Sequence, residues 1–66
     1  MSANESLGRL RELEERLRSR GDELERLAQA GDADDAVVDI LVEIAEIGKQ
    51  ILAEVDRARA SADAGA

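Results

Sequence analysis

Carboxylates are the only side chains in this chain whose types and spacing suggest chemistry. Glu43 and Glu46 lie one helical turn apart, which is a spacing compatible with a pair of acid and base carboxyl groups. Asp32, Asp34 and Asp35 form a second acidic group, and carboxylate oxygens are the ligands that Mg²⁺ and Ca²⁺ prefer. The two groups define the chemistry that has to be considered first.

Neither group has the companions that such chemistry requires. The chain contains no His and no Cys, so the commonest general base and the strongest nucleophile are both absent. Glu43-Ile44-Ala45-Glu46 lacks the His of the helical-bundle metal motif, and Asp32-Ala33-Asp34-Asp35 lacks the spacing of a calcium loop. We therefore predict no catalytic, cofactor-binding or metal-binding residue, no cofactor, and no enzymatic activity.

The composition favours association with another polypeptide. A chain of 66 residues can bury only a marginal core, and without Cys or His neither disulfides nor a structural zinc site can reinforce it. It has no aromatic residue to stack on bases, and its net charge of −7 repels phosphate backbones and anionic lipids. Oligomerisation is the remaining source of stability, and we expect neither nucleic acid nor membrane as a partner.

Turn signals divide the chain into two predicted helices. Gly31 is suited to ending a helix, and the three Asp residues that follow are N-cap candidates for the next one. The pattern predicts a flexible N-terminus over 1–5, a helix over about 6–30, a turn over 31–34, a helix over about 35–60 and a flexible tail over 61–66. Because short connections join antiparallel neighbours, the predicted fold is an all-α antiparallel hairpin.

The first predicted helix has one narrow apolar seam. Five of its leucines follow a heptad repeat of the coiled-coil type, interrupted by a charged residue at Arg20: Leu10, Leu13, Leu17, Leu24 and Leu27. Asp22 and Glu25 can start a new helix as a capping box, but Leu17 and Leu24 keep the same phase across Gly21. We therefore favour one continuous helix.

The second predicted helix is apolar over a wider arc than one seam can cover. One stripe of it is polar and consists of Asp39, Glu43, Glu46, Gln50, Glu54 and Arg57. The predicted intramolecular core consists of Leu10, Leu13, Leu17, Leu24, Leu27, Val37, Ile40, Ile44, Ile47 and Ile51. The predicted interface with a partner consists of Val38, Leu41, Val42, Ala45, Gly48, Leu52 and Val55. Gly48 lacks a side chain and would let another helix approach closely.

Charges are also divided between the helices. Arg9, Arg16 and Arg20 follow one flank of the leucine seam, and residues from 32 onward carry nine acids against three basic residues. An arginine row beside an acidic stripe favours pairing between the helices that fixes their register, although solvated charge is an equal alternative.

The leading functional prediction is a structural module that self-associates as a homodimeric four-helix bundle. The alternative is an adaptor or non-catalytic subunit that docks the same apolar face onto one larger protein. In size, acidity and a two-helix plan broken at Gly31-Asp32, the chain resembles the small subunit of bacterial exonuclease VII, and this resemblance implies the second role. Dimer or tetramer, the orientation of the hairpins, and exchange of helices between chains all stay open.

A cytoplasmic location is expected from the same residues. Residues 1–6 lack the basic and apolar regions of a secretory signal. Asp39, Glu43 and Glu46 interrupt the most apolar segment, so it falls short of the ~18 apolar residues of a membrane span.

Overall fold

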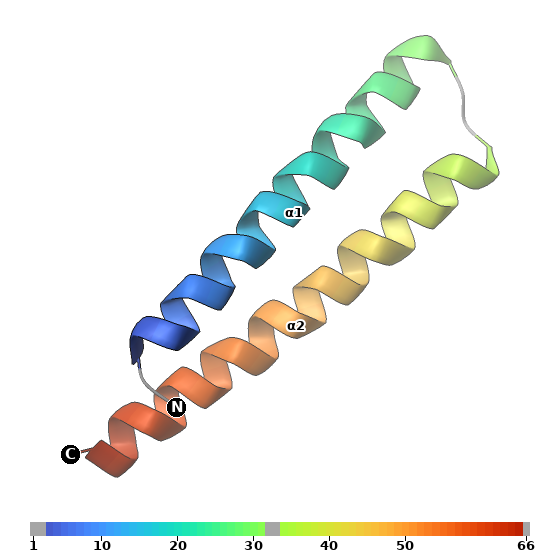
Figure 1. Ribbon diagram of the computed structural model, residues 1–66. Helices are drawn as coiled ribbons and strands as arrows, with labels where there is room; N and C mark the ends of the chain where they lie inside the picture. The colour runs from blue at the N-terminus through green and yellow to red at the C-terminus, as the bar shows by residue number, and fades with distance from the viewer. Residues whose placement is uncertain (1–2, 32–33, 66) are drawn as a thin grey trace.

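The fold is an all-helical hairpin. The computed structural model describes residues 3–31 and 34–65, which form helix α1 (Ala3–Ala30) and helix α2 (Asp35–Gly65). The two helices lie side by side in opposite directions over most of their length (Figure 1). The two-helix, all-α prediction is therefore confirmed. Residues 1, 2 and 66 of the predicted flexible ends, and residues 32 and 33 of the predicted turn, lie outside the described residues.

Both helices are longer than the sequence pattern predicts. Helix α1 begins at Ala3 instead of residue 6, and α2 continues to Gly65 instead of ending near residue 60. Helix α1 also passes through Gly21 without a break, which confirms that the first helix is continuous. The terminal extensions contain Ala, Ser and Asn with few apolar side chains, so they have no hydrophobic periodicity from which helix could be predicted.

Gly31 and Asp34 define the two helix ends at the turn. Gly31 has a φ of +78°, and its N–H donates to the carbonyl oxygen of Ala28 at 3.2 Å. This left-handed conformation after the last helical residue is the usual glycine C-cap. Asp34 immediately precedes α2, and its Oδ1 accepts the N–H of Ala36 at 3.1 Å, as an N-cap residue does. Of the three N-cap candidates, Asp34 therefore makes the capping contact seen in the described residues.

We expect Gly31→Ala to destabilise the chain by about 1 kcal/mol, because an L side chain is strained at positive φ. Gly8→Ala is the matched control. Gly8 lies inside α1, and a Cβ there would meet nothing within 4 Å. Replacing a helical Gly by Ala should stabilise the chain by about 0.5–1 kcal/mol. Chemical denaturation followed by circular dichroism measures both, and equal effects of the two substitutions would contradict the capping role.

A single seam between the helices forms the small core. Leu13, Ile40 and Ile47 are buried, and the other seven predicted core residues are partly buried. The molecule measures 52 × 15 × 11 Å. Its accessible surface is 4932 Å², whereas a folded monomer of this mass is expected to expose about 4,100 Å². Two helices in contact thus leave much of their apolar surface exposed to solvent.

Candidate interaction surface

The outer face of α2 carries the residues predicted to form an interface. This outer face consists of Val38, Leu41, Val42, Ala45, Gly48, Leu52 and Val55. Its four largest exposed side chains are Val38, Leu41, Val42 and Leu52, with exposed fractions of 57, 49, 57 and 67%. Ala45 is also exposed, while Gly48 and Val55 are half-buried. These residues are spread along about 25 Å of one helix, given a rise of 1.5 Å per residue.

Leu7 is an exposed apolar residue of α1 that the sequence pattern did not assign to the interface. Its exposed fraction is 47%. Leu7 lies one residue after Ser6 and three before Leu10, so it falls beside the heptad seam rather than in it. Extending the search for exposed apolar residues to the flanks of the leucine seam would have found it.

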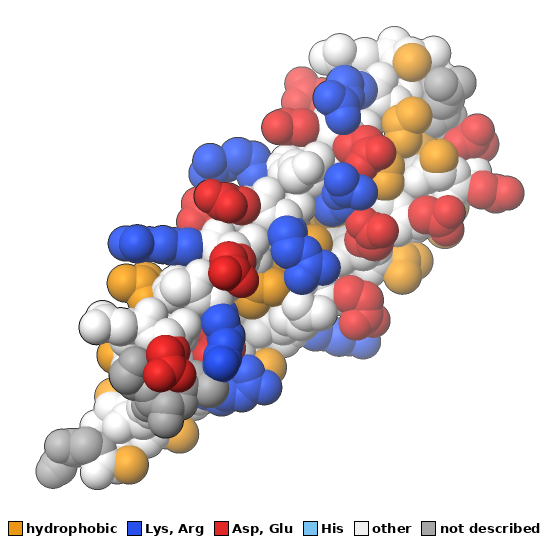
Figure 2. Space-filling view, in the orientation of Figure 1, with side chains coloured by type: hydrophobic (Ala, Val, Ile, Leu, Met, Phe, Trp, Pro, Cys, Tyr) orange, Lys and Arg blue, Asp and Glu red, His pale blue; other side chains and the backbone are white. Residues whose placement is uncertain are grey.

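The opposite flank of the hairpin is polar and carries two ion pairs between the helices. Arg9 Nη1 lies 3.6 Å from Glu54 Oε1, and Arg20 Nη1 lies 3.4 Å from Glu43 Oε2. The residue numbers of both pairs add to 63, as expected for two antiparallel helices in one register. The predicted pairing between the arginine row and the acidic stripe is therefore confirmed for Arg9 and Arg20. Figure 2 shows side chains of both charges interspersed over one face of the two helices.

Two hollows lie along this polar flank. The larger has a volume of about 390 Å³ and is lined by residues of both helices, among them Arg9, Arg16 and Gln50. The smaller, of about 260 Å³, lies between Arg16, Arg20 and Glu43. Both hollows are lined mainly by exposed side chains of α1 and α2. Among the described residues, no loop residue lines either hollow. They do not provide the desolvated pocket that acid-base chemistry requires.

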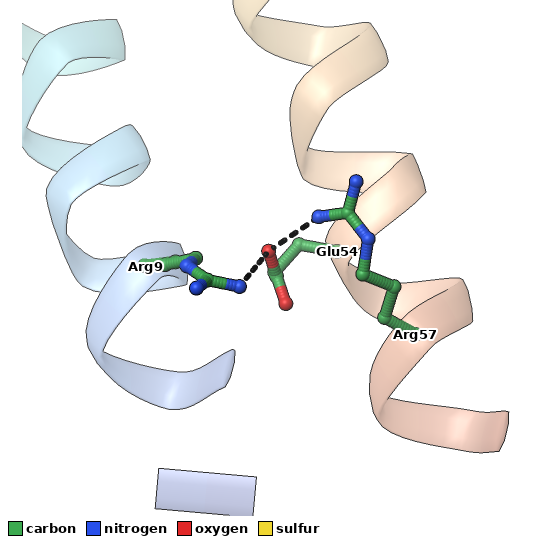
Figure 3. Close-up of polar contacts among 3 residues, drawn as sticks. All are labelled: Arg9, Glu54 and Arg57. Atoms are coloured by element: carbon green, nitrogen blue, oxygen red, sulfur yellow. Dashed lines mark hydrogen bonds and ion pairs between the residues drawn. The ribbon is translucent and has the colours of Figure 1, made fainter. Parts of the chain in front are cut away.

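Glu54 departs from its predicted place. The sequence pattern assigned it to the exposed polar stripe, but its side chain is only 2% exposed and lies in the seam between the helices. Its Oε1 accepts from Arg57 Nη1 at 2.9 Å and faces Arg9 across the helix interface (Figure 3). Ser6 is also buried, and its hydroxyl donates a hydrogen bond to Glu54. The prediction of an exposed Glu54 is therefore wrong.

The surroundings of Glu54 favour its charged form. Burial raises the pKa of the Glu54 carboxyl group, because it removes water from the charge. The hydrogen bond from Ser6 and the positive charges of Arg57 and Arg9 outweigh burial, and the net pKa is lowered. The carboxylate is thus ionised at neutral pH and neutralised by two arginines that are themselves about half exposed.

The burial of Ser6 and Glu54 follows from the heptad repeat. Ser6 lies seven residues before Leu13, and Glu54 lies seven residues after Ile47, so each occupies the seam position of a buried apolar residue. Continuing the repeat backward from Leu13 and forward from Ile47 would have placed both residues in the seam. Their polarity conceals this, because a hydrophobic pattern is defined by apolar residues alone.

Metal-holding side-chain groups and membrane-spanning helices can both be checked in the described residues. Within 3–31 and 34–65, no group of three or more acidic side chains gathers where it could hold a metal ion. Asp32, one of the three acidic candidates, lies outside the described residues. Neither helix, over the part that is described, has an apolar stretch of the length and purity that spanning a bilayer would take.

Comparison with known proteins assigns no relative. No protein-family model, no curated protein and no solved structure matches the chain. The resemblance to the exonuclease VII small subunit therefore consists of size, charge and helix plan. The function of the chain has to be inferred from the outer face itself.

Proposed function

We propose that this chain is a non-catalytic structural module that self-associates through the outer face of α2. The assembly is a homodimer in which two hairpins form a four-helix bundle. The observation that supports this most directly is the exposure of Val38, Leu41, Val42 and Leu52 on one helix. Contiguous exposed apolar patches of a few hundred Å² are typical of binding surfaces on small proteins.

The energetics of the hairpin point in the same direction. Only three apolar side chains are buried among the described residues, which is a small core against the cost of ordering the chain. Burying a Val or Leu side chain contributes about 1.5–3 kcal/mol. Covering the four large side chains of the outer face therefore adds a contribution comparable to that of the intramolecular core.

Self-association is preferred over docking to a larger protein because a copy of the chain presents an identical apolar face. In a two-fold dimer the same surface of both copies is covered at once, and closed two-fold dimers are the commonest oligomers. Both copies then bury their exposed apolar side chains, and no different protein is needed to cover them.

Size-exclusion chromatography with light scattering on the isolated chain tests this proposal. We expect the molar mass of a dimer at micromolar concentrations, together with a helical circular dichroism spectrum and a melting temperature that rises with protein concentration. A well-folded monomer whose melting temperature is independent of concentration would overturn it. A poorly helical or aggregating chain would instead favour the alternative in which a different protein covers the outer face.

A further inference from the structure

Six residues of the outer face form a second heptad seam on α2. They are separated by alternating steps of three and four residues, the same spacing as the inner seam that packs against α1. In order, they are Val38, Leu41, Ala45, Gly48, Leu52 and Val55. A seam with this period accepts a further α-helix rather than a flat surface or a small ligand.

The residue types along this outer seam are symmetric about its midpoint except for the central pair, Ala45 and Gly48. Valine occupies both ends, leucine the next position from each end, and the two smallest residues the centre. The numbers of each symmetric pair, 38 and 55, 41 and 52, and 45 and 48, all add to 93. A two-fold axis perpendicular to α2 at that midpoint sets valine beside valine, leucine beside leucine, and Ala45 beside Gly48 of a second copy.

We infer that two copies pair their α2 helices in antiparallel orientation about this axis, with Ala45 and Gly48 at the crossing point. This inference rests on the proposed self-association and specifies its geometry. Straight helices that cross approach most closely at the crossing, where small side chains allow short interaxial distances. The larger Leu and Val side chains then fill the widening space on both sides.

Gly48 supports this placement because the hairpin alone gives no reason for it. A Cβ at Gly48 would meet nothing within 4 Å, and glycine inside a helix costs about 1 kcal/mol relative to alanine. Gly8 and Gly21 on α1 are equally open, but Gly48 lies at the centre of the outer seam, where a missing side chain lets a second helix approach closely. The second copy is the occupant that the symmetric seam specifies.

Charges at the two ends of the outer seam distinguish antiparallel from parallel pairing. One step beyond the valines lie Asp34, the N-cap residue just before α2, at one end and Arg59 at the other, both exposed, and their numbers again add to 93. Antiparallel pairing brings Asp34 of each copy to the level of Arg59 of the other. Parallel pairing would bring like charges together at both ends and align the two helix dipoles, which is unfavourable.

Single cysteines test the orientation cleanly because the chain has none of its own. A Val38→Cys chain is mixed with a ¹⁵N-labelled Val55→Cys chain and oxidised, and the linked products are weighed by intact mass spectrometry. Cys is a small, largely apolar residue, so each substitution changes the seam little. We expect the mixed disulfide in clear excess over the amount that random pairing gives. Two copies of Val38 should lie about 25 Å apart, too far for a disulfide.

The control replaces the Val55→Cys chain with Gln50→Cys, which places the thiol on the polar stripe, and we expect little mixed product from it. Light scattering on the reduced single variants measures their molar mass, which tests self-association separately from the orientation of the helices. A dimer that links Val38→Cys to itself and Val55→Cys to itself would overturn antiparallel pairing while leaving self-association intact. A monomer that links at random would overturn self-association and the orientation with it.

Discussion

Leu52→Glu should dissociate the dimer and leave the hairpin folded. Leu52 has the largest exposed fraction among the large apolar residues that the structure describes, 67%, so within one chain it contributes little to the core. In the proposed dimer each copy buries one Leu52, and losing that burial costs about 1.5–3 kcal/mol per copy. The two losses together, about 3–6 kcal/mol, correspond to a dissociation constant raised by about 10²–10⁴-fold. Analytical ultracentrifugation over a range of concentrations measures the change.

Gln50→Glu is the matched control for this substitution. It introduces the same charged side chain two residues away on the same helix, but on the polar stripe, where Gln50 is exposed. The dissociation constant should change by less than about threefold, because an exposed charge contributes little. Val42→Glu should act like Leu52→Glu, since Val42 belongs to the outer face. Equal weakening by Gln50→Glu and Leu52→Glu would mean that net charge, and not the apolar face, governs association.

Unfolding measurements distinguish a dissociated hairpin from an unfolded one. If the outer face serves only the partner, the Leu52→Glu monomer should keep its helical circular dichroism spectrum near 25 °C. Its melting temperature should become independent of protein concentration, because folding is no longer coupled to association. Complete loss of helix would show instead that the hairpin has no stable monomeric form.

The helical plan was predictable because its signals are local. The heptad spacing of leucines from Leu10 to Leu27 requires only that apolar residues recur on one face of a helix. Gly31 and Asp34 have conformational preferences that act within one turn of chain, and the structure places both at helix ends as those preferences dictate. The breadth of the apolar arc on the second helix was equally visible in the sequence.

Continuing the heptad repeat places Glu54 in the seam, but the contacts that it makes there were not predictable in the same way. An isolated helical wheel places Glu54 at the edge of the polar stripe, and residue type alone favours solvent for a carboxylate. Its position in the seam is stabilised by Ser6 and Arg9, which lie more than forty residues earlier in the chain. A contact of that kind depends on the register of two helices, and periodicity within one helix carries no information about register.

Acidification should reveal the contribution of Glu54 to stability. Its pKa in the folded chain is lower than in the unfolded chain, so the unfolded state binds the additional proton as the pH falls. The stabilising contribution is therefore complete above the unfolded pKa, about 4.3, and is lost as the pH falls through the lower folded pKa. A Glu54→Gln chain has no carboxyl group to titrate at this position and should not show this loss.

The measurement is the free energy of unfolding of both chains between pH 7 and pH 2.5, at one protein concentration and one ionic strength. At pH 7 the Glu54→Gln chain should be the less stable of the two, because Arg9 and Arg57 lose their buried negative partner. As the pH falls from about 4.3 through the lower folded pKa of Glu54, the difference should shrink, since the Glu54 carboxyl group becomes neutral like the Gln side chain. Glu46→Gln controls for the loss of an exposed carboxylate and should cost less than about 1 kcal/mol at pH 7. A difference between the unsubstituted and Glu54→Gln chains that stays constant over the whole range would contradict an ionised Glu54 in the seam.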